Sequence, residues 1–166
     1  MKRNRLPTVV GIAALMGLWS YGAIASGKLD DATILAIFDQ ANAADIYTAR
    51  LGAKYGSSEE VRALGRMVEA DHVAVQQMGR DLAKTLNIVP SPPENDTSVT
   101  DQAKTVSSLQ SAAGPEFDKA YLQHEIAFHQ SVITAVKQTL LPASNDPPAE
   151  PGAFVREPLE AAKRGR

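Results

Sequence analysis

Two stretches of this sequence place acidic side chains and histidines among apolar residues at helical spacing. In the first, "HEIAFHQ", Glu125 and His129 are four residues apart. At about 100° per residue, they lie about 40° from each other around a helix. His124 falls on another side of that helix and is expected at its rim or surface. His129 falls at the centre of an apolar stripe, so Glu125 and His129 are expected to point into a core; the stripe contains Leu122, Ile126, Ile133, Val136 and Leu140.

The second stretch, "EADH", supplies Glu69, Asp71 and His72. Glu69 and His72 are three residues apart and therefore lie on adjoining turns of one helix. Asp71 and His72 straddle the apolar stripe of the same helix. Further upstream, Asp45 stands seven residues after Phe38, which places it on the apolar face of an earlier helix.

Carboxylates and imidazoles that are buried together are typical of metal sites. A buried carboxylate costs free energy unless it is paired or bound to a cation. Oxygen and imidazole ligands suit Fe, Mn or Zn, and a Glu with a Glu-x-x-His helix is part of the pattern of di-iron carboxylate bundles. The alternative is a set of core hydrogen bonds that fixes helix register without any ligand. The predicted ligands are Asp45, Glu69, Asp71, His72, Glu125 and His129.

The elements that must position these residues are helices. Apolar residues recur at helical spacing, and no strand-like alternation or hairpin turn is found. Asp30 or Asp31 can cap the first helix, Gly56 can end it, and Pro115 can open the last one. The loop between the first two helices is short, so these helices are expected to be antiparallel neighbours. Three strong helices are expected, at about 30–55, 59–86 and 115–141. A weaker helix is expected near 99–112.

Proline-rich segments divide the chain. "NIVPSPPENDTS" separates two of the helices, and "PASNDPPAEPG" follows the last strong one. The tail "AFVREPLEAAKRGR" is expected to be weakly helical at best, because Pro158 interrupts it. The prediction is one antiparallel four-helix-type bundle over 31–141, with a shortened or weak last helix, followed by a linker and tail at 142–166.

The N-terminal 25 residues have the three-part layout of a secretory signal peptide. "MKRNR" is basic, "VVGIAALMGLW" is apolar, and "AIA" supplies small residues before a cleavage point after Ala25. The apolar run is short for a membrane span, which needs about 20 residues. The mature protein is therefore expected in the periplasm or cell envelope, without a stable membrane span. The alternative is an uncleaved N-terminal anchor.

Several other chemistries are excluded or unsupported. The chain has no cysteine, so it has no disulfide and no thiol nucleophile. It has no Gly-x-Ser-x-Gly elbow and no glycine-rich phosphate loop. The formal net charge of −2 gives no sign of nucleic-acid binding. No residue is predicted to be catalytic, and the pattern favours a non-enzymatic protein over an enzyme.

The sequence resembles the DUF4142 family, on the acid at Asp45, "RMVEADH" at 66–72 and "FDKAYLQHEIAFHQ" at 117–130. These are bacterial exported or membrane-associated proteins of unknown function. The resemblance implies a ferritin-like helical bundle. It also implies that the Asp-His pair of the family falls on Asp71 and His72, and that its late histidine falls on His129.

The chain departs from the family pattern at two places. Phe128 stands where the family often has an acid directly before the late histidine. The tail after residue 141 has no histidine, although family members tend to finish with a further helix that carries one. If that helix completes the core, an apolar seam would be left exposed here, and a second copy of the chain could cover it.

Overall fold

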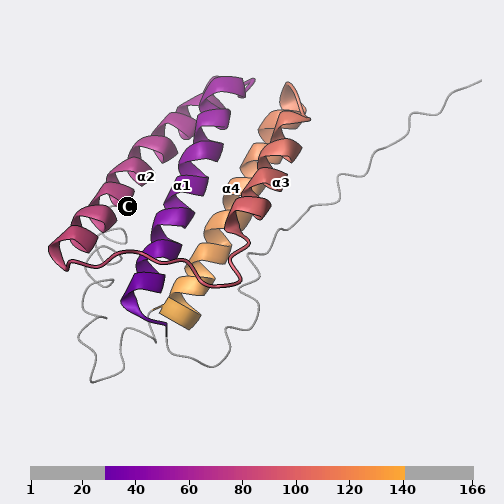
Figure 1. The fold of residues 1–166 in the computed structure, drawn as a ribbon. Helices are drawn as coiled ribbons and strands as arrows, with labels where there is room; N and C mark the ends of the chain where they lie inside the picture. Colours follow the sequence, from indigo (N-terminus) through magenta and orange to yellow (C-terminus); the bar gives the residue numbers. More distant parts are fainter. Residues whose placement is uncertain (1–28, 141–166) are drawn as a thin grey trace, which may run out of the picture.

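The computed structural model describes residues 29–140, which form an all-α bundle (Figure 1). No strand is found among these residues, which confirms the predicted fold class. The last helix continues into one π-helical turn. The elements are α1 (Asp31–Tyr55), α2 (Glu59–Thr85), α3 (Ser98–Gln110), α4 (Pro115–Ala135) and the π-helical turn Val136–Leu140.

The helix ends are set by local side-chain and backbone chemistry. The Asp30 carboxylate accepts a hydrogen bond from the Thr33 amide at 2.8 Å and so caps α1. Ser58 caps α2, because its hydroxyl accepts a hydrogen bond from the Val61 amide at 3.2 Å. Gly114 adopts φ 59°, a left-handed conformation that favours glycine, immediately before α4 opens at its proline.

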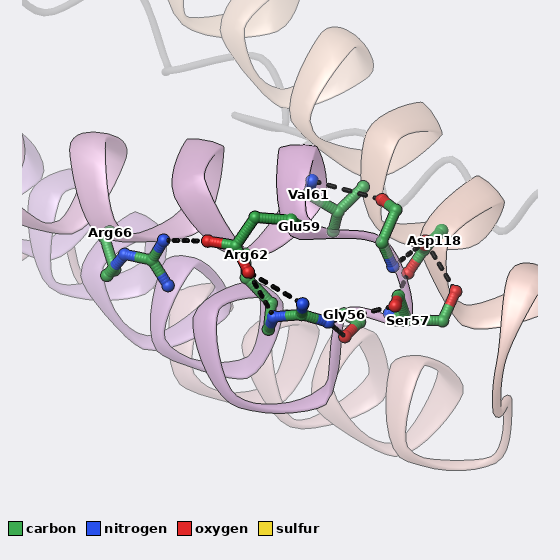
Figure 2. A network of polar contacts seen from close by, with 8 residues as sticks. Gly56, Ser57, Glu59, Val61, Arg62, Arg66 and Asp118 are labelled. Atoms are coloured by element: carbon green, nitrogen blue, oxygen red, sulfur yellow. Dashed lines mark hydrogen bonds and ion pairs between the residues drawn. The ribbon is translucent and has the colours of Figure 1, made fainter.

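A polar network ties the start of α4 to the turn between α1 and α2 (Figure 2). The Asp118 carboxylate accepts hydrogen bonds from the Ser57 amide and hydroxyl, both at 2.7 Å, and from the Ser58 amide at 2.9 Å. Burial acts to raise the pKa of Asp118, but these hydrogen bonds outweigh it and lower the pKa to about 2. On the other side of the turn, Arg62 donates to the Gly56 and Ser57 carbonyls. The Asp118 hydrogen bonds fix the position of α4 along the bundle.

Helix α1 packs against α2 on one side and against both α3 and α4 on the other (Figure 1). The α1–α2 contact is close because Gly65 lies directly against the backbone of α1. A Cβ atom at that position would be 2.4 Å from the Ala53 amide nitrogen and 2.7 Å from the Ala49 carbonyl oxygen. On the α4 side, Gly52 lies under the ring of Tyr121. Small residues therefore let both partner helices approach α1.

The buried face of α4 is rotated relative to the predicted one. Its buried residues are Phe117, Tyr121, Glu125 and Phe128. The prediction that Leu122, Ile126 and Ile133 face the core together with His129 was wrong, because these three side chains are exposed. Aromatic rings remove more apolar area from water than Leu or Ile, so the face that carries them is the one that is buried. The result is an exposed apolar row on α4.

The predicted signal peptide at 1–25 and the predicted tail at 142–166 lie outside the described residues. Within 29–140, none of the helices has the length and apolarity needed to cross a membrane.

Candidate metal site

Three helices bring Asp45, His72 and His129 together. The Asp45 carboxylate on α1 is fully buried, and its Oδ2 lies 2.8 Å from Nε2 of His72 on α2. The same oxygen lies 3.5 Å from Nε2 of His129 on α4. One ligand atom from each residue falls within 4.8 Å of the other two. The two imidazoles are partly exposed, with 25% and 39% of their side-chain surface accessible, so they form the outer side of the cluster.

The environment of His72 determines which of its ring nitrogens carries the proton. Nδ1 lies 3.0 Å from Oδ1 of Asn42. The Asn42 amide nitrogen donates to the Phe38 carbonyl at 2.7 Å, which fixes the orientation of that amide and leaves its oxygen toward His72. An amide oxygen can only accept, so Nδ1 of His72 is the donor. The neutral imidazole therefore presents an unprotonated Nε2 to Asp45.

His129 is held in the same tautomer by a different acceptor. Its Nδ1 lies 2.9 Å from the backbone carbonyl oxygen of Glu125, one turn earlier on α4. A carbonyl oxygen can only accept, so Nδ1 carries the proton here too. The neutral imidazole again presents a bare Nε2 to the carboxylate of Asp45. Histidines that bind metals are oriented in this manner, by a hydrogen bond from the other ring nitrogen.

The consequence is that three atoms with lone pairs face one another. Neither oxygen of Asp45 has a hydrogen-bond partner among the described residues, although His72 Nε2 approaches Oδ2 to 2.8 Å. The approach is therefore close, but it does not have the direction of a hydrogen bond. Two neutral nitrogens and a buried carboxylate in this arrangement repel one another unless a positive charge lies between them. Either a cation or additional protons on the imidazoles can supply that charge.

Glu125 forms an inner layer behind this cluster. Its carboxyl is buried, and its Oε2 lies 3.7 Å from Nδ1 of His129, on the side of the ring away from Nε2. Burial, and then the negative charge of Asp45, raise the pKa of Glu125 to about 8. Burial and the charge of Glu125 likewise raise the pKa of the Tyr121 hydroxyl above its usual value.

The structure brings together four of the six predicted ligands: Asp45, His72, Glu125 and His129. Glu69 is instead paired with Arg50 at 2.7 Å, and Asp71 is exposed. The i, i+3 spacing places Glu69 on the same side of α2 as His72, but it faces the outer edge of α1. Asp71 lies about 100° from His72 and so points away from α1.

His124 is half-buried, in line with the predicted rim position. Its ring centroid lies 5.8 Å from that of Phe128. Burial lowers its pKa; the charge of Asp45 acts to raise it, and His129 acts to lower it.

Sequence reasoning missed Asn42 and Tyr121. Asn42 stands three residues before Asp45 and Tyr121 four residues before Glu125, so both lie on adjoining turns of the same faces. That spacing could have identified them as neighbours of the predicted ligands. It could not have shown that the Asn42 oxygen faces His72.

No curated protein and no solved structure matches this chain. A family model described as a domain of unknown function, DUF4142, matches residues 21–157. The match includes all of the described bundle and every residue of the cluster. The chain therefore belongs to the DUF4142 family.

Proposed function

We propose that this protein binds a divalent first-row transition metal ion through Asp45, His72 and His129. The observation that carries the proposal is the direction of the two imidazoles. Both donate from Nδ1 to a neutral oxygen and turn Nε2 toward one buried carboxylate oxygen. An ion between the three would supply the missing positive charge and would neutralise Asp45.

The distances between the ligand atoms suit such an ion. Donor atoms about 2.0–2.2 Å from a metal are separated from each other by about 3.0–3.5 Å. The separations of 2.8 and 3.5 Å from Asp45 Oδ2 to the two nitrogens therefore need only small adjustments. Two imidazoles and one carboxylate suit Fe, Mn or Zn, and we propose an ion of this group.

Zinc binding to matched histidine variants tests the proposal. The full chain, purified without an affinity tag or chelator, is titrated with Zn²⁺ by calorimetry, and its thermal midpoint is measured with and without the metal. Free Zn²⁺ at 100 times Kd should stabilise the fold by about 2.7 kcal/mol. His129→Gln should abolish this effect.

The control is His124→Gln, which removes a half-buried histidine from the same helix without touching Asp45. It should bind Zn²⁺ like the wild type. The proposal fails if the wild type shows no saturable binding, or if both variants lose zinc binding equally.

A second candidate function is a non-catalytic helical module in which protons replace the ion. The 2.8 Å separation between His72 Nε2 and Asp45 Oδ2 is also that of a close ion pair, which favours this reading if the ring is protonated. The histidines would then hold α2 and α4 against α1. In that case the stability would depend on pH but not on metal, and His72→Asn would cost the same stability with and without Zn²⁺.

We also propose that the protein acts in the periplasm or cell envelope. The support is the basic, apolar and small-residue layout of residues 1–25 alone. The mass of the protein recovered from a periplasmic extract tests this proposal. A chain beginning at Ser26 is expected, and recovery only in the cytoplasmic fraction would contradict it.

A further inference from the structure

Five buried side-chain oxygens lie behind the candidate metal site without a hydrogen-bond partner among the described residues. They are both oxygens of Asp45, both oxygens of Glu125 and the hydroxyl of Tyr121. Asp45 and Tyr121 are fully buried, and Glu125 is 6% exposed. Buried oxygens in such number are costly, because each has lost its bonds to water. The proposed ion accounts for only one of them, Asp45 Oδ2.

The oxygens belong to one compact group. Tyr121 and Glu125 stand one turn apart on the buried face of α4, and the His129 ring lies 3.5 Å from Asp45 and 3.7 Å from Glu125. The Thr48 hydroxyl on α1 donates to the carbonyl oxygens of Ala44 and Asp45. The group therefore offers more acceptor lone pairs than hydrogen-bond donors.

Glu125 is poorly placed to complete the outer site. Its Oε2 lies beside Nδ1 of His129, whereas the proposed ion lies on the Nε2 side of that ring. No nitrogen ligand faces the inner group from His129, because Nδ1 is turned to the Glu125 carbonyl. The inner ligands are thus all oxygen, and the outer ligands are two nitrogens and one oxygen.

We propose that Glu125, Tyr121 and the second carboxylate oxygen of Asp45 form a second cation site, directly inside the first. This inference rests on the proposed function, because Asp45 is shared between the two ions through its two oxygens. An all-oxygen site takes a hard divalent cation, such as Mn²⁺, in preference to a softer ion. The second ion would balance the charge of Asp45 and of an ionised Glu125 in this buried position.

The test is a sequential loading of the full chain with two metals. One equivalent of Zn²⁺ first fills the outer site, and bound zinc is counted after gel filtration. Mn²⁺ is then titrated, and the loss of the free-ion electron paramagnetic resonance signal reports its binding. The wild type should take up one Zn²⁺ and then one Mn²⁺. Glu125→Gln, which keeps the shape of the side chain, should retain the Zn²⁺ and weaken Mn²⁺ binding by at least about 10- to 100-fold.

Tyr121→Phe and Asp71→Asn complete the design. The first should weaken Mn²⁺ binding and leave Zn²⁺ in place, and retained Zn²⁺ shows that the variant is folded. The second changes an exposed acid and should alter neither metal.

The outcomes separate the two proposals. One Zn²⁺ with no saturable Mn²⁺ overturns the second site and leaves the outer site standing; a proton or a water then satisfies the inner oxygens. Mn²⁺ binding that is unchanged in Glu125→Gln also overturns it. If the wild type binds neither metal, both proposals are overturned. If it binds Mn²⁺ but not Zn²⁺, and Glu125→Gln abolishes the Mn²⁺ binding, only the outer site is overturned.

Discussion

The contact of Gly65 with α1 permits a sharp test of how the bundle positions its site. An alanine Cβ at this position would lie 2.4 Å from one α1 backbone atom and 2.7 Å from another, whereas ordinary contact begins at 3.4 Å. Backbone atoms within a helix cannot move aside alone, so Gly65→Ala must separate α1 from α2 by about 1 Å locally. Overpacking of this kind costs about 1–3 kcal/mol.

The alanine also has a favourable effect, because it raises helix propensity by about 1 kcal/mol. The clashing atoms belong to the backbone and cannot rotate away, so the overpacking cost should lie at the upper end of its range, at about 3 kcal/mol. After the gain in helix propensity is subtracted, we expect the free energy of unfolding to fall by about 2 kcal/mol. For a domain of this size, that loss lowers Tm by about 6–10 °C. His72 lies two turns further along α2, so its Nε2 should also move away from Asp45. Metal affinity should therefore fall, since metal–ligand distances tolerate only about 0.2 Å.

Gly79→Ala is the matched control on the same helix. The added Cβ would meet only the ring of Phe38, at 2.8 Å, and that partly buried side chain can rotate. Chemical and thermal denaturation of both variants, with zinc titration, should show a large loss for Gly65→Ala and a small one for Gly79→Ala. Equal stability of the Gly65→Ala variant and the wild type would refute the reasoning.

Three further changes have defined outcomes. Asp118→Asn should lower Tm at pH 7. Because the folded-state pKa of Asp118 is depressed to about 2, its stabilising effect is present above pH 4 and is lost as the pH falls toward 2. In a pH series, the difference in Tm between this variant and the wild type should therefore shrink between pH 4 and pH 2. Asn42→Ala should weaken Zn²⁺ binding by about 10- to 100-fold in a chelator competition, although Asn42 is no ligand, because His72 loses the acceptor that orients it. Glu69→Gln should change the free energy of unfolding by less than about 1 kcal/mol and leave metal uptake unchanged, since its partner Arg50 is largely exposed.

The sequence predicted the helices well because their boundaries depend on local chemistry. Asp30 and Pro115 act on the backbone within one turn, and α1 and α4 begin where these residues indicate. The last predicted helix, to about residue 141, is present as α4 and the π-helical turn that ends at Leu140.

The candidate site was predictable in part, since the angle around a helix shows which residues share a face. That reasoning correctly placed Asp45, His72 and Glu125 toward the core. It also placed His129 at the centre of the buried stripe, whereas 39% of its side-chain surface is exposed. Apolar character alone did not show that the aromatic residues of α4 determine its buried face. The direction of the Glu69 side chain could not be predicted from the sequence. Glu69 forms an ion pair with Arg50, and this contact exists only because α1 packs on α2.

Metal content of the protein as the cell makes it tests the central claim most directly. The protein is isolated from the cells that make it without a tag or chelator, and its iron, manganese and zinc are measured against protein concentration. We predict at least one of these ions per chain in the wild type, and none in a His72→Asn, His129→Gln double variant that remains folded. A wild-type protein that is folded, stable and free of all three metals, and that takes up none when they are added, would contradict the account.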